Sequence, residues 1–322
     1  MTSVLKRALH CMLLLLGVSA LSFALLSAAP GNFFDELKLQ PQISRETVAA
    51  LEAQYGMDRP LPVRYFDWIT AAAHGDFGYS MSCRCPVASL LWWRAGNTLL
   101  LAGLATLLAW IVALSLGILQ ALHPGGWFDR FGNTLTVALL AIPELLISLL
   151  LLLLAARTGW FPTGGMSSLD AANRHLPGRL TDLAAHLFLP VLALALGAVP
   201  FLIRHVRSAM ITALESPFIE AARGHGIPNL RLLFRFALPA ASNSLISLLG
   251  FSVGALTSLS LLVEIVLSSP GLGPLVLEAV LARDVYVVMA AVMLASIFLV
   301  FGNLIADLIL YRVDPRIRLV QP

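Results

Sequence analysis

The segment FGNTLTVALLAIPELLISLLLLLLAA, residues 131–156, decides the fold because it holds no Lys or Arg and only one carboxylate, that of Glu144. It is longer than the roughly 20 residues with which an α-helix crosses the hydrocarbon of a bilayer. A backbone in lipid must make its hydrogen bonds within the protein, so the segment predicts a membrane-spanning helix. Pro143, just before the carboxylate, predicts a kink in it.

Five further apolar runs have a comparable length, at about residues 11–29, 96–122, 184–206, 240–267 and 287–310. Hydrophobic residues make up 58% of the 322-residue chain and charged residues 12%, against about 25% charged in soluble domains. The mean hydropathy is +0.85. We predict an all-α integral membrane protein, a six-helix bundle in which residues 1–322 form one transmembrane domain. The first run also resembles a signal peptide, but we interpret it as a retained helix.

The positions of Lys and Arg predict the orientation, because cytoplasmic loops carry an excess of them. If both termini are cytoplasmic, the inner segments hold eleven basic residues and four acids. The basic residues are Lys6, Arg7, Arg130, Arg204, Arg207, Arg223, Arg231, Arg235, Arg312, Arg316 and Arg318. The inverse orientation would reverse this bias, so we predict a multi-pass protein of the bacterial inner membrane with both termini inside.

Residues 30–93 form the only long loop region, which we predict to be extracytoplasmic and partly helical. Ser44 is a suitable N-cap for a helix that stops at Gly56, and a second helix is predicted from Pro60 to Gly75. The loop at 157–183 is predicted to form an outer cap with an aromatic anchor.

The segment SPFIEAARGHGIPNLRLLFRFALP at 216–239 follows the fourth apolar run on the predicted inner side. Ser216 and Pro217 suit the N-cap and the first position of a helix. Gly226 with Pro228 predicts a sharp end to it. We therefore expect a short helix at the membrane surface, held by longer helices on both sides.

The spacing within this segment resembles the EAA loop, through which permeases of binding-protein-dependent ABC importers contact their ATPases. The matching residues are Glu220, Ala221, Ala222, Gly226, Leu238 and Pro239. Phe236 stands where Ile is more usual. The resemblance implies that residues 215–239 form a cytoplasmic ATPase-coupling loop.

Other segments are similar to the dipeptide, oligopeptide and nickel permeases, in the form of their first permease subunit. They are APG at 29–31, YGMDRPLP at 55–62, GDFGYS at 75–80, Glu264 with PGLG at 270–273, and Asp307 with DPRIR at 314–318. Ser269 and Glu144 depart from the residues usual in that family. The resemblance covers nearly the whole chain and implies the fold of a type I ABC importer.

The resemblance implies that this chain is one permease subunit of an importer for a peptide, a nickel chelate or a similar small solute. Its expected partners are a second permease subunit in a heterodimer, two ABC ATPase subunits and an extracytoplasmic solute-binding protein, with no cofactor and no nucleic acid. The chain has no phosphate-binding loop, because its lysines are Lys6 and Lys38 and neither follows a glycine. We therefore expect no ATPase site of its own, and the chain is not predicted to be an enzyme.

An ion-coupled secondary transporter is the alternative, with Glu144, Glu264 or Asp307 as proton or sodium sites. A carboxylate inside a span is costly and often functional, so Glu144 is a candidate for the translocation path, with a helix-packing role as the alternative. Glu264 and Asp307 are expected to make structural hydrogen bonds or ion pairs, and His186 and His205 to pack at the interfaces. Cys83 and Cys85 are interpreted as an incidental pair, because a one-residue gap disfavours a disulfide.

The predicted topology can be tested with single cysteines introduced on its two sides. In intact cells Ser167→Cys should react with a membrane-impermeant thiol reagent, whereas Asn229→Cys should react only after permeabilisation. Equal labelling of the two variants in intact cells would contradict the six-helix model.

Overall fold

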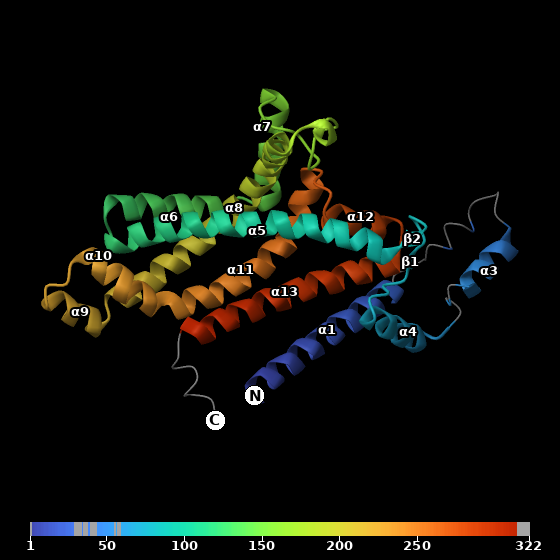
Figure 1. Ribbon diagram of the computed structural model, residues 1–322, viewed down its shortest axis with the longest axis horizontal. Helices are drawn as coiled ribbons and strands as arrows, with labels where there is room; N and C mark the ends of the chain where they lie inside the picture. The colour runs from blue at the N-terminus through green and yellow to red at the C-terminus, as the bar shows by residue number, and fades with distance from the viewer. Residues whose placement is uncertain are drawn as a thin grey trace. The chain divides into compact units, whose positions relative to one another are not determined.

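The computed structural model describes residues 2–28, 34, 38, 44–54, 56 and 59–313, and this part of the chain is mostly helical (Figure 1). It forms two compact units. The first comprises Met1–Thr98 and Pro270–Ile297, and the second comprises Leu99–Ser269 and Phe298–Pro322. The long helices α5 (Val87–Leu122) and α13 (Val285–Val313) run through both units. The motifs at 29–31 and 314–318 lie outside the described residues.

Five helical stretches in the described chain are long and apolar enough to cross a membrane. They are α1 (Thr2–Ala28), α5, α8 (Leu176–Leu214), α13, and the stretch from Asn229 that ends with α11 (Leu238–Val266). Two shorter helices, α6 (Trp127–Leu140) and α7 (Glu144–Thr158), pass the same test together. If this pair is counted as one span, the described residues contain the six predicted spans.

The third predicted span differs from expectation because α6 and α7 meet at 92°. The cause is Pro143, which has an extended ψ of 140°. A proline has no N–H for the carbonyl four residues earlier, its ring clashes with that carbonyl, and it disfavours helical backbone in the preceding residue. The carbonyl of Pro143 instead accepts the N–H groups of Leu146 and Ile147, at 2.9 and 3.1 Å, and so begins α7.

Helix α8 is the centre of the second unit and packs against α6, α7 and α11. Two clusters of buried apolar side chains lie along it, one around Leu202 and Met210 and one around Leu189 and Leu194. Helix α5 contributes to both clusters. The indole of Trp110 on α5 also donates a hydrogen bond to Ser252 Oγ on α11, at 2.8 Å.

Small residues bring α11 and α13 together in the second unit. A Cβ added at Gly250 would lie 2.3 Å from the Cβ of Ala306 and 3.4 Å from the carbonyl oxygen of Gly302. One at Gly254 would lie 1.9 Å from a methyl group of Leu299. Close backbone approach of this kind is a common way for helices to associate where lipid provides no hydrophobic driving force.

In the first unit, the two predicted loop helices are confirmed as α3 (Arg45–Gln54) and α4 (Leu61–Ala73). Ser44 Oγ accepts the N–H of Thr47 at 3.1 Å, which is the predicted cap. Gly56 and Gly75 both have positive φ where the helices end. Helix α4 packs on α1 through Tyr65, whose hydroxyl lies 2.8 Å from Ser19 Oγ.

The short helix α12 (Leu272–Leu281) begins in the PGLG segment and is tied to the first third of α5. Asn97 Nδ2 donates to the carbonyl of Pro270 at 2.7 Å. The N–H of Leu272 donates to Thr98 Oγ1 at 2.9 Å, within the buried interior. Thr98 therefore satisfies an N–H group that the first turn of α12 leaves unpaired, and Asn97 satisfies the carbonyl of the residue before the N-cap.

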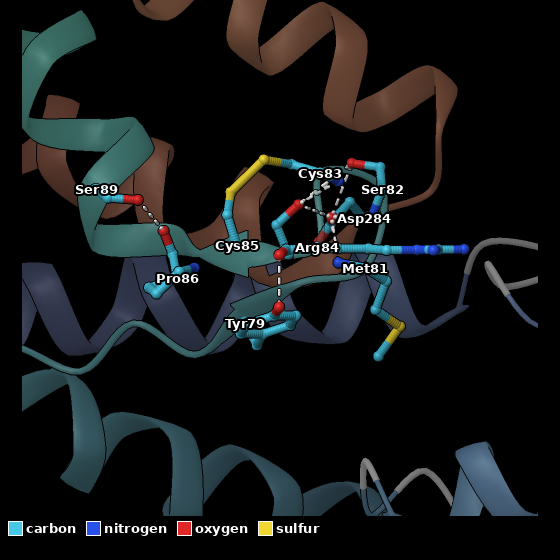
Figure 2. The surroundings of a disulfide bond; sticks show 10 residues. Tyr79, Met81, Ser82, Cys83, Arg84, Cys85, Pro86, Ser89 and Asp284 are labelled. Atoms are coloured by element: carbon cyan, nitrogen blue, oxygen red, sulfur yellow. Dashed lines mark hydrogen bonds between the residues drawn. A yellow bond between two sulfur atoms is a disulfide. The ribbon is translucent and has the colours of Figure 1, made fainter.

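The interpretation of Cys83 and Cys85 as an incidental pair is wrong, because the two residues form a disulfide (Figure 2). They lie at the end of a small hairpin with the strands β1 (Tyr79–Ser80) and β2 (Cys85–Pro86). Arg84, between the cysteines, has a left-handed φ of 57°. This turn brings the two Cα atoms to 5.4 Å, a separation that a disulfide commonly spans.

The α11–α13 contact predicts a difference between two glycine substitutions. Gly250→Ala should lower stability by about 1–3 kcal/mol, because the new methyl group meets Ala306 and backbone that cannot rotate away. Gly103→Ala on α5 is the matched control, since a Cβ there has no atom within 4 Å. Thermal melting of both variants in detergent micelles measures the difference. Equal melting temperatures would show that α11 and α13 do not approach as described.

Candidate functional site

The predicted surface helix is present as α9 (Pro217–Gly224), which follows directly after α8. Ser216 is its N-cap residue, and Pro217 occupies the first turn, as predicted. The serine hydroxyl makes no capping hydrogen bond and donates instead to the carbonyl of Ala213. The position of the helix start is thus confirmed, while the side chain of Ser216 serves the end of α8.

Helix α9 ends in the glycine motif expected at 226. Gly226 has a φ of 76°, and its N–H donates to the carbonyl of Arg223 at 3.0 Å. The N–H of Ile227 donates to the carbonyl of Ala222 at 3.4 Å. This pair of bonds is the Schellman arrangement, in which a left-handed residue reverses the chain and satisfies the last carbonyls of a helix.

The two faces of α9 differ sharply in exposure. Ile219 is fully buried and Ala222 is 8% exposed, and both belong to the apolar cluster that joins α5, α8 and α11. On the other face, Phe218 is 50% exposed, and Glu220, Ala221 and Arg223 are exposed as well. The helix is therefore anchored to the core along one side and offers a mixed apolar and charged surface along the other.

A short irregular segment connects α9 to α11. It consists of α10 (Asn229–Leu232) and the π-helical turn η2 (Leu233–Ala237). Pro239, in the first turn of α11, cannot donate a hydrogen bond to the carbonyl of residue 235. The wider turn accommodates this loss, and the N–H of Leu238 reaches the carbonyl of Leu233. Such π-type turns are frequently found at functional sites.

The six residues predicted for this site divide into two groups. Ala222 and Leu238 pack in or against the same apolar cluster. The remaining four, Glu220, Ala221, Gly226 and Pro239, are exposed. The structure thus brings two members together in the core and leaves the others on the surface of one segment.

An ion pair that was not predicted from the sequence holds the neighbouring helices α6 and α8 together. Asp129 on α6 is 4% exposed and accepts two hydrogen bonds from Arg207 on α8, at 2.6 and 2.8 Å. It also accepts the N–H of Gly125 at 2.8 Å. The paired, two-pronged geometry fixes the α5–α6 turn to α8, because the guanidinium matches a carboxylate in one plane. The sequence does place these opposite charges in two predicted inner segments, but their positions along the chain do not show that they form an ion pair.

Glu144 lies where α6 and α7 meet and is the first residue of α7. Its side chain faces α8 at Gly197, where an added Cβ would lie 3.5 Å from the Glu144 carboxyl carbon. One of its carboxyl oxygens is buried and makes no hydrogen bond within the described chain. The carboxylate predicted for the middle of a span is therefore placed at a break in that span, against a glycine that leaves it room.

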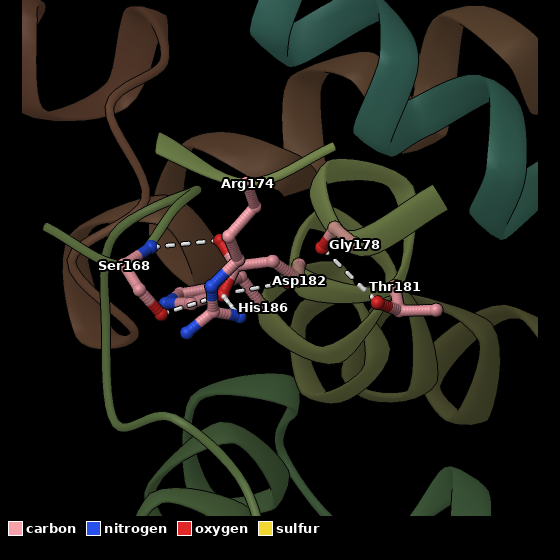
Figure 3. A network of polar contacts seen from close by, with 6 residues as sticks. All are labelled: Ser168, Arg174, Gly178, Thr181, Asp182 and His186. Carbon is pink, nitrogen blue, oxygen red and sulfur yellow. Dashed lines mark hydrogen bonds and ion pairs between the residues drawn. The ribbon is translucent and has the colours of Figure 1, made fainter. Parts of the chain in front are cut away.

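A second polar cluster, also missed, surrounds Asp182 on α8 (Figure 3). Its carboxylate accepts the N–H of Ser168 at 2.8 Å and the serine hydroxyl, and Arg174 Nη1 lies 3.4 Å from it. His186 is buried, with Nδ1 2.8 Å from the carbonyl of Asp182. These contacts fasten the loop before α8 to the helix, and they agree with the packing role expected for His186.

Long apolar helices, a bent helix pair and an anchored short helix together define a multi-pass membrane protein. Family comparison makes this specific. Residues 113–319 match the model described as "Binding-protein-dependent transport system inner membrane component", and residues 1–99 match the model of its N-terminal region. The chain belongs to this family, and it is a permease subunit of an ABC importer. The predicted family and fold class are thereby confirmed.

Relatives align over nearly the full chain. The oligopeptide transport system permease protein AppB of Bacillus subtilis (strain 168) is 35% identical over 317 residues, which cover 98% of both chains. The glutathione transport system permease protein GsiC of Salmonella typhimurium is 30% identical over 316 residues, again 98% of both. The solved inward-facing MetNI methionine ABC transporter shares the fold at a TM-score of 0.56 and 19% identity, covering 70% of this chain and 96% of that one.

The backbone at the end of α9 predicts different costs for the substitution of two nearby glycines. Neither Gly224 nor Gly226 has an atom within 4 Å of an added Cβ, but only Gly226 has positive φ. Gly226→Val should therefore cost about 1–2 kcal/mol through the backbone alone, while Gly224→Val should cost little. Amide hydrogen exchange of residues 217–227 should accelerate in the first variant only. The same exchange rate in both would contradict the left-handed end of the helix.

Proposed function

We propose that α9 couples this permease to an ATPase subunit, with Glu220, Ala221, Ala222, Gly226, Leu238 and Pro239 as the coupling residues. The observation that carries the proposal is the division of α9 into a buried face at Ile219 and Ala222 and an exposed face with Phe218 and Glu220. The exposed face fits a socket on a soluble partner. The buried face could transmit a movement of that partner to the helices packed against α9.

The packing of α9 suggests how such motion travels. Ile219 and Ala222 share one cluster with residues of α5, α8 and α11. A displacement of α9 would therefore push on all three helices. Protein interiors are close-packed and move as units rather than yielding locally. The Asp129–Arg207 pair adds α6 to the group by binding it to α8. Closure of the ATPases would thus tilt a block of helices between inward-facing and outward-facing states.

The substrate class we propose is a peptide. Its support is the relatives, which are named for oligopeptide and glutathione transport. Glu144 is the residue we propose for the translocation path. It sits at the break between α6 and α7 with a buried carboxyl oxygen that makes no hydrogen bond within the described chain, and a carboxylate there would suit an amino group of a passing peptide.

Partners and orientation complete the proposal. The chain has no Gly-Lys-Ser/Thr sequence for phosphate binding, so two separate ATPase subunits would supply hydrolysis. A second permease subunit and an extracytoplasmic solute-binding protein would complete the importer. The bias of Lys and Arg supports cytoplasmic termini, an extracytoplasmic location for residues 30–93, and a cytoplasmic location for 215–239.

Two glutamate substitutions test the coupling role. Glu220→Ala should reduce the ATPase that co-purifies with the chain severalfold, as expected when an interface loses about 1 kcal/mol. It should also lower transport-coupled hydrolysis. Glu278→Ala is the matched control, since Glu278 is an exposed glutamate on α12, which the proposed topology places on the outer side. Both are compared at equal membrane expression. If Glu220→Ala retains ATPase and transport like the control, α9 is not the coupling element.

A further inference from the structure

The hairpin Tyr79–Pro86 has few backbone bonds of its own. Its ladder consists of two residue pairs, Tyr79 with Pro86 and Ser80 with Cys85. Pro86 has no N–H to contribute to it. Beyond the ladder, the N–H of Arg84 donates to the carbonyl of Ser80 at 3.0 Å. The Tyr79 hydroxyl donates to the carbonyl of Arg84 at 2.5 Å, and the N–H of Val87 donates to the carbonyl of Gly78 at 3.0 Å. The disulfide adds a covalent bond to these hydrogen bonds at the tip.

The tip of this hairpin surrounds a buried carboxylate, that of Asp284 in the turn between α12 and α13 (Figure 2). Asp284 is 2% exposed. One of its oxygens, Oδ2, accepts the hydroxyl of Ser80 at 2.7 Å, the N–H of Met81 at 3.0 Å, and the N–H and hydroxyl of Ser82 at 3.3 and 3.1 Å. A buried carboxylate needs such donors, because an unpaired charge away from water is costly.

The disulfide connects directly to this nest of donors. The N–H of Cys83 donates to Ser80 Oγ at 3.1 Å, and the same oxygen bonds Asp284. Arg84 holds a left-handed φ of 57° between the two cysteines, a conformation that residues with a Cβ rarely adopt. Once the sulfurs separate, Arg84 is held by hydrogen bonds to the Ser80 carbonyl and the Tyr79 hydroxyl in place of the covalent bond beside it. Its relaxation to a more favourable φ would carry Cys83 and Ser82 away from the carboxylate.

We propose that the Cys83–Cys85 disulfide is a redox-controlled fastener that binds the hairpin to the start of α13 through Asp284. In the oxidised chain the converging donors hold the carboxylate and fix the α12–α13 turn. Reduction opens the tip, weakens these bonds and releases the turn. The proposal rests on the proposed function only in placing the hairpin on the extracytoplasmic side, where disulfides persist.

A phosphine reductant supplies the required electrons without a second thiol. It transfers two electrons to the disulfide and leaves as its oxide, with the oxygen of one water molecule. The two protons of that water complete the two thiols. The chain has three cysteines, and the third, Cys11, lies on α1 and is free. Alkylation followed by mass measurement should therefore find one reactive thiol before reduction and three after it.

The decisive measurement is amide hydrogen exchange of the full chain, purified with its accompanying subunits into lipid nanodiscs. Reduction should accelerate exchange at residues 81–83 and 284–288 by about tenfold, the effect of losing one hydrogen bond to a charged group. The double variant Cys83→Ser/Cys85→Ser should exchange fast with or without reductant. Asp284→Asn should keep the disulfide yet exchange fast at 81–83. Cys11→Ser, the matched control, should respond as the parent does.

Two results would overturn the proposal. One is three reactive thiols before reduction in chain taken directly from membranes. The other is unchanged exchange at 81–83 and 284–288 after both thiols have been freed. Neither depends on ATP hydrolysis or uptake, so failure of the fastener and failure of the coupling role remain distinguishable.

Discussion

A backbone in hydrocarbon has no water to bond, and this constraint governs how the second unit is built. A regular helix satisfies this constraint with its own backbone hydrogen bonds. The positions where a helix is interrupted therefore show how the remaining backbone groups are satisfied. At Pro143 the carbonyl is satisfied by Leu146 and Ile147, and at Pro239 the chain widens into a π-helical turn. The predicted functional residues lie beside these interruptions: Glu144 follows the first, and Leu238 precedes the second. Where the regular pattern is broken, side chains and backbone groups become available for purposes other than spanning the membrane.

Much of this architecture could be predicted because its causes are local in sequence. Long apolar runs predict helices whatever their partners, and capping chemistry placed the ends of α3, α4 and α9. A positive φ at Gly226 could be expected from its neighbours in the chain, since glycine after a helix most often serves that purpose. The proposed coupling segment was found by its residue spacing, and the fold divides its residues between the apolar cluster and the exposed surface.

The features that escaped prediction depend on which helices meet. Asp129 and Arg207 pair across 78 positions of sequence, and Ser80 reaches Asp284 across 204. The local sequence around each of these residues does not indicate which distant residue it will contact. The disulfide between Cys83 and Cys85 escaped prediction for a different reason. It was judged from the one-residue gap between the two cysteines, whereas the left-handed Arg84 in that gap brings their Cα atoms to 5.4 Å. Likewise, Pro143 predicted a kink in a continuous span, but not that the two halves would meet at 92°.

That bend has a consequence for how the protein is made. At 1.5 Å per residue, α6 with 14 residues and α7 with 15 are each about 21–23 Å long, whereas the hydrocarbon is about 30 Å thick. Neither half can cross alone, and the exposed ends of each would leave backbone groups in lipid. Both α6 and α7 contact α8, which is synthesised after them. The broken span must therefore wait in a sheltered setting, such as the insertion machinery, until the ribosome has delivered α8. Biogenesis of this permease is thus expected to proceed in blocks of several helices rather than one helix at a time.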